Sequence, residues 1–134
     1  MPMAILIHGG ELIVKGNKKY MHTLQDVQQE IDHLVKEEWH SHYWAPLSSL
    51  ARLTEEVGEL AREINHLYGE KPKKATEAEG SISKELGDIL YIVASLANSL
   101  DIDLDTAFNE VMQKYRIRDA KRWQSQETTV PINE

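Results

Sequence analysis

The sequence predicts an all-α protein, a four-helix bundle with a short N-terminal extension. Apolar residues recur at alternating steps of three and four in four separate stretches, which is the spacing that lines one face of a helix. Short polar segments separate these stretches, so neighbouring helices can pack around one core. The length of 134 residues and the hydrophobic content of 41% suit a single domain.

Residues 1–20 differ from the rest of the chain. Two short β-prone runs, AILIH and ELIVK, flank Gly9-Gly10, which is the pattern of a β-hairpin with a two-residue turn. A lone hairpin is marginally stable in water and would need a surface to pack on. The alternative is that Met21 is the true start, and that residues 1–20 come from an over-long gene assignment or from the expression vector. The apolar run is too short for a signal peptide.

The first helix is expected to begin after Thr23, because Thr23 and Asp26 have the spacing of a capping box. Its apolar positions are Leu24, Val27, Ile31 and Leu34. The segment 39–46 breaks the pattern, and a second helix is expected over 47–67, followed by a polar loop over 68–80. The apolar positions of the second helix are Leu50, Leu53, Val57, Leu60, Ile64 and Leu67.

A third helix is expected over 82–100. Its apolar positions follow the same rhythm and are Ile82, Leu86, Ile89, Val93, Leu96 and Leu100. Asp103 can cap a fourth helix. The apolar positions of the fourth helix are Leu104, Ala107, Phe108, Val111 and Tyr115. The pattern decays after Arg118, so we expect the helical domain to span 21–122 and a C-terminal tail to span 123–134.

Composition and charge exclude several classes of protein. The net charge of −7 disfavours binding to duplex nucleic acid, and no apolar run is long enough to cross a membrane. The absence of cysteine excludes disulfides, thiolate metal sites and a cysteine nucleophile, and it fits a cytoplasmic location. An acidic surface would repel a phosphorylated substrate unless a metal ion or a local basic patch intervened.

An acidic pentapeptide occurs twice, as EVGEL over 56–60 and as ELGDI over 85–89. Successive residues of a helix are about 100° apart around its axis. The first acid of each repeat therefore lies roughly 60–70° from the centre of its apolar stripe, and the second acid lies roughly 120–130° from it. Both acids lie on the same side of the stripe in both helices. If both stripes pack into one core, these flanks either face each other or both face away. When they face each other, four carboxylates converge on one groove, those of Glu56, Glu59, Glu85 and Asp88.

Each repeat also contains a glycine, Gly58 or Gly87, inside a predicted helix. A glycine in the middle of a helix is less favourable than alanine by about 1 kcal/mol. Close approach of another helix would explain both glycines, and subunit packing could provide it.

Converging carboxylates repel one another unless a cation neutralises them. Oxygen ligands suit a hard divalent ion, so we expect Mg²⁺, with Mn²⁺ as a substitute. A di-iron bundle site would need a histidine three residues after a glutamate, which neither repeat provides. The alternative is a solvated acidic face, which is common for a single pair of glutamates.

Two smaller groups of residues permit more than one interpretation. His40 and His42 form an HxH pair, but no third metal ligand lies within reach in the sequence. Lys71, Lys73 and Lys74 lie in the loop between the acidic repeats and either attract phosphates or form a solvated loop.

The two repeats together resemble the EExxE…ExxD signature of the MazG-type, all-α nucleoside triphosphate pyrophosphohydrolases, a superfamily that includes dimeric dUTPases and dCTP pyrophosphatases. The phrases LTEEVGELAREIN and KELGDILYIVASLAN are similar to the usual wording of this family, and the similarity covers roughly residues 24–123. In this chain the signature positions are Glu55, Glu56, Glu59, Glu85 and Asp88.

The resemblance implies Mg²⁺-dependent hydrolysis of a nucleoside triphosphate to a monophosphate and pyrophosphate, in housecleaning of the nucleotide pool. It implies that the metal ligands are Glu56, Glu59, Glu85 and Asp88. Glu55 points about 170° away from the apolar stripe, so we expect it to support the ligands or to form an ion pair. Water would attack directly, because no Ser, Cys or His nucleophile is required.

The resemblance further implies that Lys114 and Arg118, four residues apart on one helix face, grip phosphates. Alternatively, Lys114 pairs with Glu110 and both cations favour the helix C-terminus. Aromatic residues before the second helix either stack on the base or pack at a corner of the fold. These residues are Trp39, Tyr43 and Trp44.

A homo-oligomer, either a dimer or a tetramer, is expected, because four helices leave the groove short of walls and members of the family form composite sites. The sequence does not indicate the base or the sugar. Two rival interpretations remain, a non-catalytic helical oligomerisation module and a metal- or nucleotide-binding regulator.

Overall fold

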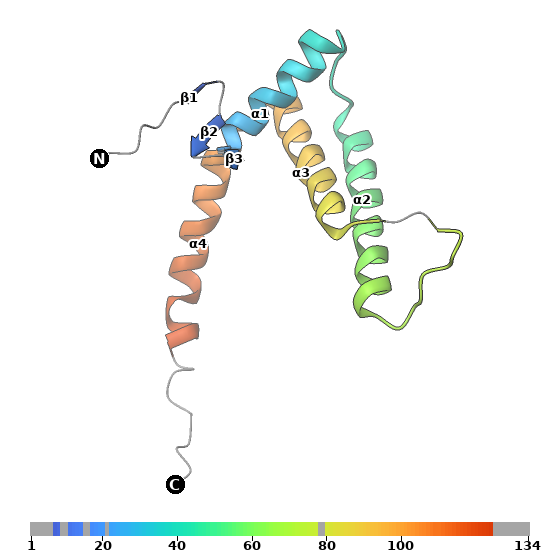
Figure 1. Ribbon diagram of the computed structural model, residues 1–134. Coiled ribbons are helices and arrows are strands. Elements are labelled where there is room, and N and C mark those ends of the chain that lie inside the picture. The colour runs from blue at the N-terminus through green and yellow to red at the C-terminus, as the bar shows by residue number, and fades with distance from the viewer. Residues whose placement is uncertain (1–6, 9–10, 15–16, 21, 78–79, 125–134) are drawn as a thin grey trace.

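Figure 1 shows the computed structural model of the chain, which consists mainly of helices. The described residues are 7–8, 11–14, 17–20, 22–77 and 80–124. The predicted all-α fold class is confirmed. None of the described helices is both long and apolar enough to cross a membrane.

Three short strands lie in the N-terminal extension and form an antiparallel sheet. They are β1 (Ile7–His8), β2 (Glu11–Val14) and β3 (Asn17–Tyr20). His8 lies opposite Glu11, which is the register of a hairpin with a two-residue turn. The predicted turn at Gly9-Gly10 itself lies outside the described residues. The third strand was not expected, because NKKY lacks the β-branched residues that favour strands.

The first helix, α1 (Leu24–His33), begins with the predicted capping box. The N–H of Thr23 donates to Oδ2 of Asp26 at 2.9 Å, and the N–H of Asp26 donates to Oγ1 of Thr23 at 3.0 Å. A π-helical turn, η1 (Leu34–Glu38), continues this helix. The backbone of His40 then adopts a left-handed conformation with φ of 47°, and the chain leaves the helix direction. The predicted break over 39–46 is therefore present up to residue 45.

Two long helices, α2 (Pro46–Tyr68) and α3 (Ile82–Ser99), lie side by side and run in opposite directions (Figure 1). Pro46 begins α2 at a position where a missing N–H breaks no helical hydrogen bond. Ser81 caps α3, and its Oγ accepts a hydrogen bond from the N–H of Lys84 at 3.4 Å. Both helices follow the predicted ranges to within one residue.

The core of the chain is small and lies between α1, η1 and α3. Its buried members are Ile31, Val35 and Ala94. Partly buried residues surround them, namely Val27, Tyr43, Tyr91 and Leu104. The helix α1 thus crosses the α2–α3 hairpin and packs on α3 (Figure 1).

Part of the apolar stripe of α2 lies outside this core, so the supposition that both stripes face one core is met only in part. Leu50 is 52% exposed and Val57 is 48% exposed. The buried positions of α2 are instead Ser49, Glu56 and Glu63. Likewise, Glu85 of α3 is buried, whereas Leu86 and Leu90 are exposed. Carboxylates therefore occupy the contact between the two helices, whereas several residues of the apolar stripes face outward.

The last helix, α4 (Leu104–Gln124), contacts α1 and stands apart from the α2–α3 hairpin (Figure 1). Asp103 precedes it as predicted, and its Oδ1 accepts a hydrogen bond from the N–H of Asp105 at 3.1 Å. The helix continues beyond Arg118, where the apolar pattern decays, to Gln124. Its exposed apolar residues are Phe108, Val111, Tyr115, Ile117 and Trp123.

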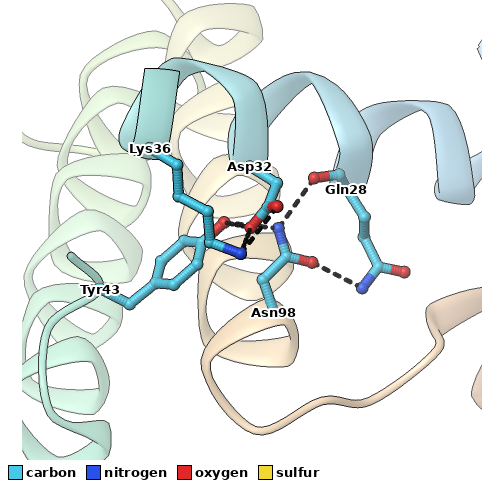
Figure 2. A network of polar contacts seen from close by, with 5 residues as sticks. All are labelled: Gln28, Asp32, Lys36, Tyr43 and Asn98. Carbon is cyan, nitrogen blue, oxygen red and sulfur yellow. Dashed lines mark hydrogen bonds and ion pairs between the residues drawn. The ribbon is translucent and has the colours of Figure 1, made fainter. Parts of the chain in front are cut away.

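A polar network joins α1, η1 and α3 to the segment that follows η1 (Figure 2). Nδ2 of Asn98 donates to the carbonyl of Gln28 at 2.8 Å and to the hydroxyl of Tyr43 at 2.9 Å. The Tyr43 hydroxyl donates to Asp32 at 2.7 Å, and Lys36 donates to the same carboxylate at 2.9 Å. Burial, followed by the bond to Asp32, raises the pKa of Tyr43 to about 12, so the hydroxyl remains a donor at neutral pH.

The network predicts that Asn98→Leu destabilises the protein. The substitution leaves the Gln28 carbonyl and the Tyr43 hydroxyl without the amide, so we expect the free energy of unfolding to fall by about 2 kcal/mol. Urea unfolding measures this loss. The exposed Asn109→Leu on α4 is the matched control, and a similar loss in both variants would contradict the assignment.

Candidate active site

Three acidic side chains meet where α2 and α3 pack together. One carboxylate oxygen from each of Glu56, Glu59 and Glu85 lies within 4.8 Å of the other two. Glu56 is 1% exposed and Glu85 is 6% exposed, whereas Glu59 is more accessible. On α2 the spacing of three places two carboxylates on adjacent turns of one face, and α3 supplies the third from the opposite side.

The electrostatics of the cluster fit a divalent cation. Burial, and then the charges of Glu59, Asp88 and Glu56, raise the pKa of Glu85. Oε2 of Glu85 is buried and has no hydrogen-bond partner among the described residues. A buried carboxylate oxygen without a donor is unfavourable, and a hard cation is the partner that oxygen-only ligands suit.

Asp88 lies beside this cluster and faces a cavity of about 340 Å³, which Glu56 also lines. The structure therefore brings oxygens of three of the four predicted ligands within 4.8 Å of one another, and the fourth lines the adjoining cavity. Glu55 lies outside the cluster on the exposed face of α2.

The aromatic residues predicted to bind a base line the same cavity. The lining includes Trp39, Tyr43 and Trp44 together with Arg52, Glu56 and Asp88. The polar network of Figure 2 fixes Tyr43, and the left-handed turn at His40 carries the segment toward α2. The cavity thus combines two of the predicted carboxylate ligands with the three aromatic side chains.

Arg52 also lines this cavity and was not predicted from the sequence. Its Nη1 lies 3.0 Å from Oε2 of Glu55, and its Nη2 forms an ion pair with Oε1 of the buried Glu56. The hydrogen bond to Glu55 and the charge of Glu56 raise the pKa of Arg52. The signal in the sequence was the spacing of three and four residues between the arginine and these glutamates.

Comparison with known proteins identifies the family. The sequence profile of the MazG nucleotide pyrophosphohydrolase domain matches residues 45–123, more than half of the chain. This chain belongs to the MazG nucleotide pyrophosphohydrolase family. YpjD from Bacillus subtilis strain 168, an uncharacterized protein, is 51% identical over 105 residues, which cover 78% of this chain and 94% of YpjD.

Two solved structures support the same conclusion. The crystal structure of Bacillus subtilis YpjD, named as a proposed pyrophosphatase, has a TM-score of 0.66 and 48% identity over 75% of this chain and all of that one. The Bacillus-conserved MazG protein, a nucleotide pyrophosphohydrolase, has a TM-score of 0.59 and 47% identity over 71% of this chain and 90% of that one. The MazG assignment makes the chain a hydrolase and disfavours a non-catalytic helical module.

The MazG chain does not bring Lys114 and Arg118 to the carboxylates within one subunit. Both cations lie over the ring of Tyr115, at 5.3 Å and 4.8 Å from its centroid. Arg118 also donates to both carboxylate oxygens of Asp119, at 3.2 Å and 3.0 Å. These residues are on α4, which stands apart from the α2–α3 hairpin (Figure 1).

One lysine of the loop before α3 contacts a buried acid next to the cluster. Nζ of Lys73 lies 3.7 Å from Oε2 of Glu63, which is one helical turn beyond Glu59. Lys71 and Lys74 are exposed. Glu63 was not predicted to be buried, because in a sequence one more glutamate on a helix cannot be distinguished from surface charge.

Proposed function

We propose that this MazG protein hydrolyses nucleoside triphosphates, with ribose or deoxyribose, to a monophosphate and pyrophosphate in the presence of Mg²⁺. One observation carries the proposal. The carboxylates of Glu56, Glu59 and Glu85 form a cluster, and Glu56 also lines the cavity that Asp88, Trp39 and Trp44 line. The volume of about 340 Å³ is at the lower end of the range for small-molecule sites.

The proposed metal ligands are also the catalytic residues, namely Glu56, Glu59, Glu85 and Asp88. Glu55 supports them through its ion pair with Arg52. Oxygen-only ligands favour Mg²⁺, and Mn²⁺ can substitute. When bound, the ion would offset the charge of the triphosphate and lower the pKa of a water molecule.

The side chains of the cavity orient the two reactants. Trp39, Tyr43 and Trp44 hold the base against their faces, with the phosphates toward the carboxylates. A carboxylate of the cluster accepts the proton of the attacking water. The water oxygen bonds to the α-phosphorus, the bond from that phosphorus to the bridging oxygen breaks, and pyrophosphate leaves.

Hydrolysis in water enriched in heavy oxygen tests the point of attack. The label is expected in the monophosphate, because the α-phosphorus gains the water oxygen. Label in the pyrophosphate instead would show attack on the β-phosphorus and would contradict the proposal.

The proposed assembly is a homo-oligomer, either a dimer or a tetramer. The outward stripe of α2 exposes Leu50 and Val57, and a monomer seldom leaves such a continuous apolar face uncovered. Apart from the chain neighbours and the backbone of the same helix, no described atom would lie within 4 Å of a Cβ added at Gly58 or Gly87. The space beside both glycines is therefore open to a second copy, which could also bring its α4 to the carboxylates.

Lys114→Ala is expected to raise KM about tenfold, because a phosphate loses a charge-assisted hydrogen bond. The oligomeric state is expected to stay unchanged. Steady-state kinetics and light scattering measure the two quantities. Arg116→Ala, on the opposite face of α4, is the control. An unchanged KM for every nucleotide would contradict the phosphate-binding role of Lys114 and would leave its contact with Tyr115 as its observed interaction.

The proposed setting is the cytoplasm, where the enzyme would clear unwanted nucleotides from the pool. The net charge of −7 argues against duplex nucleic acid and anionic membranes as partners. The helical domain over 21–122 would carry all of these functions.

A further inference from the structure

Arg52 contacts the carboxylate cluster and also lines the cavity that holds the aromatic residues of the proposed site. It lies one helical turn before Glu56 on α2, and its side chain lines the cavity that Trp39 and Trp44 also line. Among the described residues that line this cavity, Arg52 is the one with a permanently cationic side chain. Its side chain is 46% exposed, so the guanidinium has room to move.

In the metal-free protein Arg52 acts as the counter-ion of the cluster. The carboxylate of Glu56 is almost fully buried, and its nearest charged neighbours in the cluster, Glu59 and Glu85, are also acids. An unpaired buried carboxylate is strongly unfavourable. The ion pair of Arg52 with Glu56 removes that penalty.

A loaded site changes the partners available to Arg52. A cation on the carboxylates neutralises Glu56, so the carboxylate no longer needs the guanidinium. A triphosphate in the cavity brings about four negative charges past the same guanidinium, whose planar fork matches two phosphate oxygens. The cations predicted from the sequence, Lys114 and Arg118, lie on α4 and are not beside the cavity within one chain.

We propose that Arg52 is a substrate-binding residue that exchanges Glu56 for the phosphate chain of the nucleotide when the site is loaded. The inference rests on the proposed function and adds a phosphate ligand from the same subunit as the carboxylates. Arg52 thereby holds the acidic cluster together without metal and is released to the substrate when metal is bound.

Calorimetry separates this role from a merely structural ion pair. The variant Arg52→Met removes the charge and keeps most of the length, and Arg52→Lys keeps the charge without the fork. Arg62→Met, on the same helix and outside the cavity lining, is the matched control. Each protein is titrated first with Mg²⁺ alone and then, at saturating Mg²⁺, with a nucleoside triphosphate whose α–β bridge is a non-hydrolysable imido group.

Arg52→Met is expected to bind the analogue at least about tenfold more weakly, because a phosphate loses a charge-assisted contact. Its affinity for Mg²⁺ is expected to be equal or higher, because the competing guanidinium is gone. Arg52→Lys is expected to bind the analogue with intermediate affinity, and Arg62→Met as the wild type does. Thermal unfolding at saturating Mg²⁺ establishes that each variant is folded, and Arg52→Lys gives the answer if Arg52→Met does not fold.

Two results would overturn the inference while leaving the proposed function in place. In the first, Arg52→Met binds the analogue as tightly as the wild type does. In the second, Arg52→Met loses affinity for Mg²⁺ and for the analogue to the same extent, which indicates a structural role. Failure of the wild type to bind the analogue would remove both the proposed function and the role of Arg52.

Discussion

Glu85→Gln is expected to lower turnover at least about a hundredfold. Replacing a residue that only orients a metal ligand already lowers metal affinity or activity by about 10–100-fold, and replacing a ligand itself should have no smaller effect. Without metal, the same variant should be as stable as the wild type or more stable. Glutamine has nearly the same shape as glutamate, and it removes a charge that is buried beside Glu59, Asp88 and Glu56. Thermal unfolding in EDTA and in Mg²⁺, together with steady-state kinetics, measures both effects.

The exposed Glu30→Gln on α1 is the control, with turnover and unfolding temperature unchanged. Near wild-type turnover of Glu85→Gln at saturating Mg²⁺ would show that Glu85 is not a ligand. A marked loss of stability in EDTA would show that its charge supports the fold.

The stability of the metal-free protein should depend on pH through the same residue. The pKa of Glu85 is raised in the folded state, so its contribution is fully present below the unfolded pKa and is lost as the pH rises through the folded value. Mild acidification should therefore stabilise the metal-free wild type relative to Glu85→Gln. Binding of a cation should release the proton from Glu85. The affinity for metal should therefore fall as the pH is lowered through the same range.

Val57→Glu is expected to dissociate the proposed homo-oligomer. The side chain is 48% exposed in one chain and lies on the outward apolar stripe of α2. An unpaired carboxylate buried in a subunit contact costs about 3 kcal/mol or more, which weakens association at least about a hundredfold. Light scattering over a dilution series measures the change. Turnover should fall with dissociation if a second copy supplies Lys114 and Arg118.

The matched control is Ser48→Glu, which adds the same charge to the opposite, exposed face of α2, near its N-terminus where an acid is favourable. Dissociation by Ser48→Glu, or an intact oligomer in Val57→Glu, would place the subunit contact elsewhere.

Local signals were sufficient to predict the helices. The capping box at Thr23 and Asp26 marked the start of α1, and Asp103 marked the approach to α4. The end of α4 was harder to predict, because the residues after Arg118 lack an apolar stripe that would pack within one chain.

The clustering of Glu56, Glu59 and Glu85 was predicted by the repeat of two acidic motifs and not by the packing geometry attached to it. That geometry places Leu50 and Val57 in the core and the carboxylates on a flank of each helix. In the structure Glu56 and Glu85 occupy the helix contact itself, which is acceptable only when cations accompany them. A single sequence cannot show this, because an apolar stripe identifies a covered face without showing whether the cover comes from the same chain.

The most direct test of the central claim is a product assay. The purified protein is incubated with a panel of ribo- and deoxyribonucleoside triphosphates, in Mg²⁺ and in EDTA, and the products are separated. The carboxylate cluster predicts monophosphate and pyrophosphate in Mg²⁺ and no turnover in EDTA. Diphosphate with phosphate, turnover that persists in EDTA, or no turnover of any nucleotide would contradict it.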